Sequence, residues 1–142
     1  MTDDATGIER YNVRLLVRHP SMDPSLITST LGLTPHRTWL AGTPRTTPVG
    51  RPLSGVYKQS SWGYSYRVEA NRYFSRDVLK MVGLLEGASE FIRGVVEGGG
   101  SVNLMIGLPG TVNMGDDIPW SCLERLAALK VSLGFEVFPN FD

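Results

Sequence analysis

The residues that could carry chemistry in this chain are few and widely spaced. Cys122 is the only cysteine, and His19 and His36 are the only histidines. A cysteine nucleophile needs a base held against its sulfur, and common zinc sites need several ligands at close spacing. Asp116 and Asp117 are adjacent in a loop that contains glycine, where aspartates commonly serve as turn residues. We therefore expect no catalytic residue, no metal site and no cofactor.

Further signatures of catalysis or phosphate binding are also missing from the sequence. Cys122 opens a predicted helix, whose dipole lowers the pKa of a thiol, but without a base we expect a small buried residue there. No serine stands in the Gly-x-Ser-x-Gly pattern of a nucleophile elbow. The glycines at 98–100 precede a predicted strand, whereas phosphate-binding glycine loops precede a helix, so these glycines predict a helix stop.

A basic and aromatic segment holds the candidate binding site. Every charged residue from position 34 to 68 is basic, whereas acidic residues dominate the later half of the chain. Two tryptophans in this segment could form an aromatic wall with an arginine beside it, or both rings could close the core. The candidate residues for binding a ligand or a partner are Arg37, Trp39, Arg45, Trp62 and Arg67.

Length and composition predict one globular domain. The chain has 142 residues, of which 42% are hydrophobic, and its 14 basic and 14 acidic residues balance. Nucleic-acid-binding domains usually carry an excess of positive charge, which this balanced chain lacks, so we expect no nucleic-acid partner. The N-terminus is acidic and no apolar stretch approaches the roughly 20 residues that a bilayer needs, so we expect a cytoplasmic protein without membrane contact. We expect a flexible N-terminus at 1–9, one domain at 10–139 and a short tail at 140–142.

The elements that would position these residues follow from local patterns in the first half of the chain. Alternating apolar residues predict a strand over residues 11–17. Asp23 followed by Pro24 predicts the start of a short helix, which Gly32 would end. The proline-rich segment that follows can join the sheet only near residues 37–40.

The second half alternates helices and strands. Aromatic alternation predicts a strand over residues 62–68 with its aromatic face buried. One long helix should begin at Ser75 and Asp77 and end at the glycines at 98–100. A strand over 102–108, a helix from a capping box at Ser121 and Glu124 to about Leu129, and a strand over 131–137 complete the pattern.

This order predicts an α+β fold. Each helix carries one apolar stripe, which favours a two-layer sandwich with the helices on one face of a mixed β-sheet. We expect a ferredoxin-like core with an added C-terminal helix and strand. Free sheet edges in such a fold could pair two copies into a homodimer.

Residues 23–42 form the pattern D-P-x-x-I-x-x-x-L-G-L-x-P-x-R-x-W-x-x-G. Together with the tryptophan strand and the closing helix and strand, this pattern resembles the bacterial family of domain of unknown function 4279 (DUF4279). The resemblance covers about residues 11–139 and implies a small α+β domain without an established activity. It also implies that Arg37, Trp39 and Trp62 belong to the shared scaffold or to a shared site.

Three functional hypotheses remain open from the sequence. The first is a non-enzymatic protein-interaction module, such as an immunity-like protein that blocks its partner. The second is a small-molecule-binding module with a pocket near the two tryptophans. The third is a hydrolase-type enzyme, which would require Asp116, Asp117, Cys122 or a histidine to converge in a cleft. The first is our leading hypothesis, with the identity of the partner open.

Overall fold

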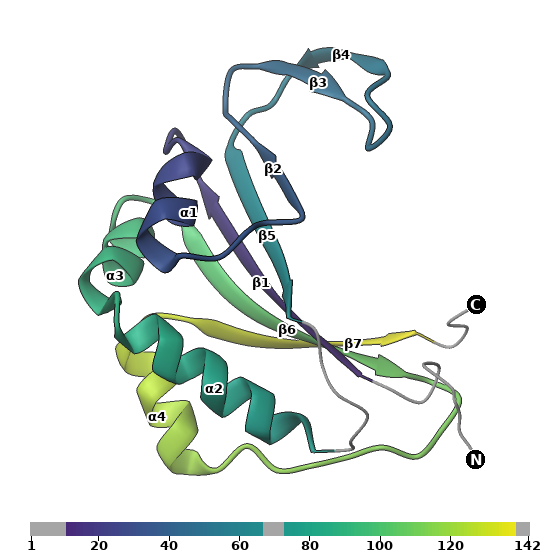
Figure 1. Cartoon of the computed structure of the whole chain (residues 1–142), viewed down its shortest axis with the longest axis vertical. Coiled ribbons are helices and arrows are strands. Elements are labelled where there is room, and N and C mark those ends of the chain that lie inside the picture. Colours follow the sequence, from purple (N-terminus) through teal and green to yellow (C-terminus); the bar gives the residue numbers. More distant parts are fainter. Residues whose placement is uncertain (1–10, 67–72, 139–142) are drawn as a thin grey trace.

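The fold is α+β, with helices covering one face of a mixed sheet (Figure 1). The computed structural model describes residues 11–66 and 73–138. Within these ranges four helices and a five-stranded sheet form the two predicted layers, and a two-stranded hairpin stands apart. The elements are β1 (Asn12–His19), α1 (Pro24–Leu31), β2 (Arg37–Trp39), β3 (Pro44–Thr46), β4 (Pro52–Val56), β5 (Ser60–Tyr66), α2 (Phe74–Glu86), α3 (Ser89–Glu97), β6 (Ser101–Pro109), α4 (Trp120–Ala128) and β7 (Ser132–Phe138).

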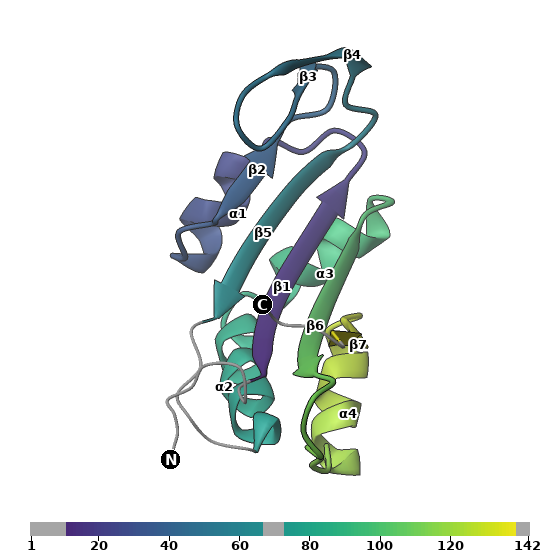
Figure 2. The same ribbon diagram turned by 90° about the vertical axis from the view of Figure 1, so that its right-hand side faces the viewer.

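The strand order of the main sheet is β2-β5-β1-β6-β7 (Figure 2). The pairs β2–β5, β5–β1 and β1–β6 are antiparallel, whereas β7 runs parallel to β6. The predicted C-terminal helix and strand are present, and the strand, β7, lies beside β6, a position that the sequence left open. The ferredoxin-like description of the remaining core stays a prediction.

The core lies between the sheet and the helices. The alternation predicted for β1 is confirmed, because Val13, Leu15 and Val17 are at most 1% exposed and share one face. Their neighbours in β6 alternate in the same way. The helices contribute the other half of this core through Ile27, Val78, Met81, Val82, Leu85, Ile92, Val95, Cys122 and Leu126.

Both ends of α1 follow the prediction. Asp23 is the N-cap, and its side chain accepts a hydrogen bond of 2.9 Å from the backbone N–H of Ser25. Gly32 adopts the left-handed conformation with φ of 69°, and its N–H donates to the carbonyl of Thr28 at 2.8 Å. These signals lie within a few residues of each other, so they act before any tertiary contact forms.

The single long helix predicted after Ser75 is wrong, because two helices occupy this segment. The chain leaves the helix at Gly87 and Ala88, where the backbone N–H groups bond to carbonyls three residues earlier. Glycine weakens a helix interior, which makes this position a natural break. Leu85 of α2 and Ile92 of α3, on either side of the break, are both fully buried in the core.

The capping box predicted for the last helix is also wrong. The N-cap is Pro119, no side chain caps this end, and Ser121 lies inside the first turn of α4. The Pro119 carbonyl instead accepts from the N–H groups of Cys122 and Leu123, at 2.9 and 3.1 Å. The earlier start still brings Cys122 onto the core side of the helix, where it is 3% exposed.

Candidate functional site

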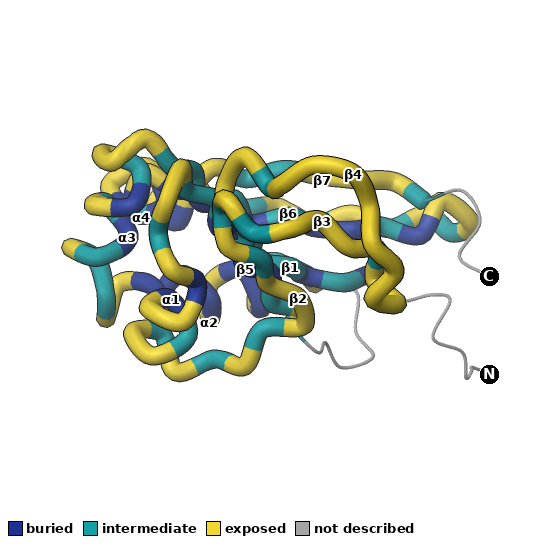
Figure 3. Tube along the Cα trace, turned by 90° about the horizontal axis from the view of Figure 1, so that it is seen from above, coloured by how far each residue is buried: buried dark blue, intermediate teal, exposed yellow. Residues whose placement is uncertain are grey.

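A hairpin arm, residues 40–59, projects from the end of the sheet on the side away from the helices (Figure 1). Its strands β3 and β4 pair antiparallel, and every residue of both strands is exposed (Figure 3). This hairpin is not among the elements predicted from the sequence. The signal for it was the run Thr47-Pro48-Val49-Gly50, because proline and glycine at the second and fourth positions are typical of a type I turn. The Gly50 N–H closes this turn on the Thr47 carbonyl at 2.9 Å.

Tyr57 anchors the arm to the sheet. Its ring stacks on Trp39 of β2, with the ring centroids 4.8 Å apart and the planes 11° from parallel. Its hydroxyl donates to the Thr46 carbonyl at 3.0 Å and accepts from the Thr46 N–H at 3.1 Å. The hydrogen bond from the Thr46 amide lowers the pKa of Tyr57, and Arg37 adds a smaller effect in the same direction. The sequence analysis did not single out this tyrosine.

Arg37 and Trp39 lie together on the face of the sheet that carries no helices. The register pairs Arg37 with Gly63 and Trp39 with Ser61, and directly opposite residues of an antiparallel pair share a face. The Arg37 guanidinium carbon lies 4.7 Å from the centroid of the Trp39 ring. This distance is a cation–π contact, so the expected arginine beside a tryptophan is present.

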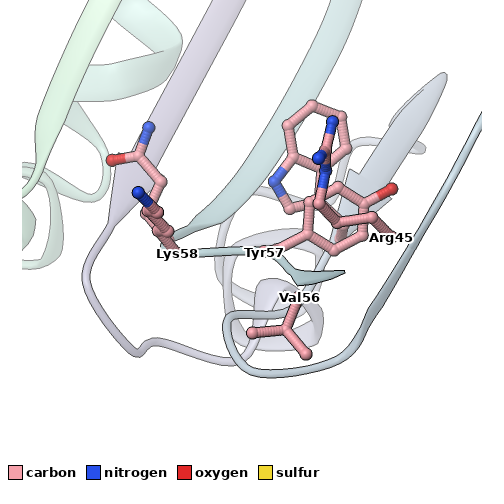
Figure 4. A pocket seen from close by; sticks show the side chains of 6 residues that line it. Arg45, Val56, Tyr57 and Lys58 are labelled. Atoms are coloured by element: carbon pink, nitrogen blue, oxygen red, sulfur yellow. The ribbon is translucent and has the colours of Figure 1, made fainter. Parts of the chain in front are cut away.

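Arg45 joins the same region from the arm. A hollow of about 280 Å³ at the base of the arm has Arg45 on one wall (Figure 4). The Arg45 Nη1 atom donates to the carbonyl of Ser54 across the hairpin at 3.2 Å, which holds the side chain over β4. The residues that line the hollow are Trp39, Arg45, Val56, Tyr57, Lys58 and Gln59.

Trp62 is not part of this region. It is 0% exposed, and its Nε1 atom donates to the Thr28 hydroxyl on α1 at 3.0 Å. Trp62 therefore lies on the helix side of the sheet, opposite to Trp39, and the two rings form no common wall. Arg67, the remaining candidate, lies outside the described residues.

The region around the arm is uniformly cationic. Between positions 34 and 66 the charged residues are Arg37, Arg45, Arg51 and Lys58, and none of them is acidic. The ion pairs among the described side chains lie elsewhere: Arg14 pairs with Glu136, and Arg125 with Glu86. In the described structure the arm therefore keeps its positive charge unneutralised by a direct carboxylate contact.

The two histidines lie on opposite faces of the sheet. His19 Nδ1 accepts the backbone N–H groups of Ser21 and Met22, both at 3.0 Å, and its ring lies beside Gly98 at the end of α3. His36 lies over Gly63, where a Cβ atom on the glycine would be 2.9 Å from the His36 Cε1 atom. Both rings are thus used in packing and in turn formation.

Cys122 and the carboxylates do not meet the histidines in a cleft. Burial raises the pKa of the Cys122 thiol, which disfavours the thiolate that a nucleophile needs. Within residues 11–66 and 73–138, no three side chains among His, Cys, Asp and Glu gather closely enough to hold a metal ion. The convergence that a hydrolase would require is therefore not seen among these residues.

Asp116 has a structural role that the sequence analysis did not anticipate. Its Oδ2 atom accepts the backbone N–H of Ser75 in the first turn of α2 at 3.0 Å, and its Oδ1 atom accepts the N–H of Asp117 at 2.8 Å. Burial raises the pKa of this carboxyl, but the hydrogen bonds from Ser75 and Asp117 outweigh burial, and the pKa lies below its ordinary value. Asp116 thus caps α2 from a loop distant in sequence.

We expect Asp116→Ala to lower the free energy of unfolding by about 1 kcal/mol at pH 7, the usual effect of losing a helix cap. The pKa of Asp116 is lower in the folded state than in the unfolded state, so its contribution is present above the unfolded pKa of about 3.9. The contribution is lost as the pH falls through the folded pKa. Urea unfolding of wild type and variant at pH 7 and at lower pH checks this, and a difference that grows in acid would contradict the assignment.

Nearly the whole chain matches the model of a known protein family. The model of the family described as Domain of unknown function (DUF4279) matches residues 9–138, nearly the whole chain. No curated protein and no solved structure matches. Of the helices in the described residues, none is long and apolar enough to cross a bilayer.

Proposed function

We propose that this chain, which belongs to the DUF4279 family, is a non-enzymatic protein-interaction module that binds an acidic partner protein through its arm. The observation that carries the proposal is the cationic arm, which projects from the sheet with all residues of its two strands exposed. An immunity-like role, in which the domain blocks the protein that it binds, is the form of this function that we favour.

Charge supports an acidic partner. Four basic residues and no acidic residue occur between positions 34 and 66, although the whole chain carries no net charge. A positive lobe of this kind steers acidic proteins toward it and disfavours basic ones, because complementary potentials raise the rate of encounter. Arginine is also enriched in protein interfaces, where its planar group pairs with carboxylates.

The exposed apolar side chains on the arm indicate that its partner is a protein. Val49, in the turn of the hairpin, is 82% exposed, and Leu53 and Val56 of β4 are 43% and 51% exposed. Protein interfaces combine such apolar contacts with a charged rim. The arm offers both on one hairpin.

Contacts at the base of the arm hold the hairpin in one conformation before any partner binds. A two-stranded hairpin is marginal by itself in water. Here Tyr57 ties both strands to Trp39, through its ring and through its two hydrogen bonds with Thr46. A recognition element that is already ordered loses less conformational entropy when its partner binds.

We expect the double replacement Arg45→Ala and Arg51→Ala to weaken binding of the partner at least about tenfold, because both exposed cations lie on the arm. The partner is first captured from a lysate by the wild-type protein, identified, purified and titrated by calorimetry. The matched control is Arg76→Ala with Lys80→Ala, which removes two exposed cations from α2 in the opposite layer.

The control double variant should bind as the wild type does. Rising salt should weaken wild-type binding more than binding of the arm variant, since exposed charges are screened. If both double variants weaken binding equally, or if no acidic protein is retained, the proposal fails.

A second candidate function rests on the hollow beside the arm. Its volume of about 280 Å³ lies just below the usual range for small-ligand pockets, which begins at about 300 Å³. Arg45 and Lys58 on its wall would favour a small anion. Such a ligand would raise the melting temperature of the isolated wild-type protein, without any partner protein present. The same ligand should not raise the melting temperature of Arg45→Ala.

A further inference from the structure

Among the described residues, β7 is an edge strand of the main sheet. It pairs with β6 on one side, and no described strand lies on its other side. It is seven residues long, whereas the strand at the opposite edge, β2, has three residues. An edge of this length presents a row of backbone N–H and C=O groups that can pair with another strand.

The edge of β7 lacks the features that usually block such pairing. Its sequence, Ser-Leu-Gly-Phe-Glu-Val-Phe, contains no proline and no lysine, and its register with β6 is continuous without a bulge. Phe135 is 51% exposed and Val137 is 64% exposed, although the alternation of the strand turns both toward the helix side. The helices cover only part of this side, where Phe135 meets the edge of the Phe74 ring at 6.1 Å between centroids.

We propose that β7 pairs antiparallel with β7 of a second copy of this chain, around a twofold axis through Phe135. This register centres the pairing on the strand, because Phe135 is its central residue. Leu133 then lies opposite Val137 of the second copy, and Phe135 opposite Phe135. The apolar row on the helix side becomes continuous across both copies, which is the self-complementarity that a twofold interface needs.

Charge selects this register over its neighbours. Glu136 is the only charged residue of β7, and it pairs with Arg14 of its own chain on the helix-free face. With the axis through Phe135, Glu136 lies opposite Gly134 of the second copy, and no like charges oppose each other. An axis through Glu136 would place the two carboxylates directly opposite, which is unfavourable. An axis through Gly134 would leave Val137 and Phe138 beyond the paired strand.

Dimerisation is tested first by sedimentation velocity over a range of protein concentrations. We expect a dimer that dissociates on dilution, and we expect Val137→Lys to raise its dissociation constant at least about tenfold, because a lysine on each copy would face Leu133 of the other. The matched control is Leu26→Lys, a lysine at an exposed apolar residue of α1, which should dimerise as the wild type does. A monomer at all concentrations, or equal effects of both lysines, would overturn the proposal.

The register is tested by crosslinking. A cysteine at position 135 would lie opposite itself, with Cα atoms about 4.5–5.5 Å apart, within disulfide range. Oxidised Phe135→Cys should therefore run as a covalent dimer. Val137→Cys should not, because it would face Leu133 instead of its own copy. Both variants also keep the native Cys122, which is buried at 3% exposure. Any crosslinking through Cys122 would therefore be the same in the two variants. Crosslinking of Val137→Cys but not of Phe135→Cys would overturn this register.

Discussion

Replacing Trp62 with alanine is expected to lower the free energy of unfolding by about 3–5 kcal/mol, the usual cost of deleting a large aromatic side chain from a core. Trp62 is 0% exposed, and its indole N–H is bonded to Thr28 at 3.0 Å. The alanine variant would leave a cavity between β5 and α1 and would leave the Thr28 hydroxyl without this donor. Chemical unfolding in urea measures the loss.

Trp39→Ala is the matched control for this prediction. Trp39 is only partly buried, and its contacts are Tyr57 and Arg37 at the base of the arm. We expect a smaller effect, about 1 kcal/mol, because the indole lies outside the core. Equal losses for the two tryptophans would show that Trp39 has a core role and would contradict the separation of the two rings.

Gly100→Ala should destabilise the fold by about 1–3 kcal/mol or more, as overpacking of a rigid contact does. A Cβ atom at Gly100 would lie 2.3 Å from the carbonyl oxygen of Arg18 and 2.8 Å from that of Val95. Both oxygens belong to the backbone, so neither can move away as a flexible side chain would. The chain passes here from α3 into β6, close against the end of β1, and only glycine permits this approach.

Gly94→Ala, at a glycine inside α3, provides the opposite expectation. No atom lies within 4 Å of a Cβ built at Gly94, which is exposed within α3. Alanine is favoured over glycine in a helix interior by about 0.5–1 kcal/mol, so this variant should be more stable than the wild type. Thermal unfolding of both variants measures the two shifts. A neutral Gly100→Ala would show that α3 can move away from β1.

The elements that the sequence predicted correctly depend on signals between near neighbours. The alternation in β1 and the caps of α1 at Asp23 and Gly32 are of this kind, and each is confirmed. The glycines at 98–100 also end a helix as predicted. The individual role of Gly100 could not be read from the sequence, because it depends on the distance to Arg18, which is far away along the chain.

The predictions that failed depended on competition between local and distant contacts. The apolar stripe suggested one helix, because it continues in step on both sides of Gly87, yet the chain forms two helices separated at Gly87 and Ala88. The pattern of Ser121 and Glu124 suggested a capping box, yet packing of Cys122 and the Pro119 carbonyl places the helix start earlier. Asp116 resembled a turn residue, but the helix that it caps begins more than forty positions earlier in the chain.

The sequence by itself determined the α+β class, the family and the cationic character of the segment around the arm. These properties follow from composition and from the order of short-range patterns, which do not depend on how the elements meet. Only the tertiary structure decided which of Trp39 and Trp62 lies in the core. Trp39 and Trp62 lie in strands paired with each other, but their positions differ by one in register, and each step along a strand turns the side chain to the other face. That step buries Trp62 under α1 and leaves Trp39 with Arg37 and Tyr57 at the base of the arm.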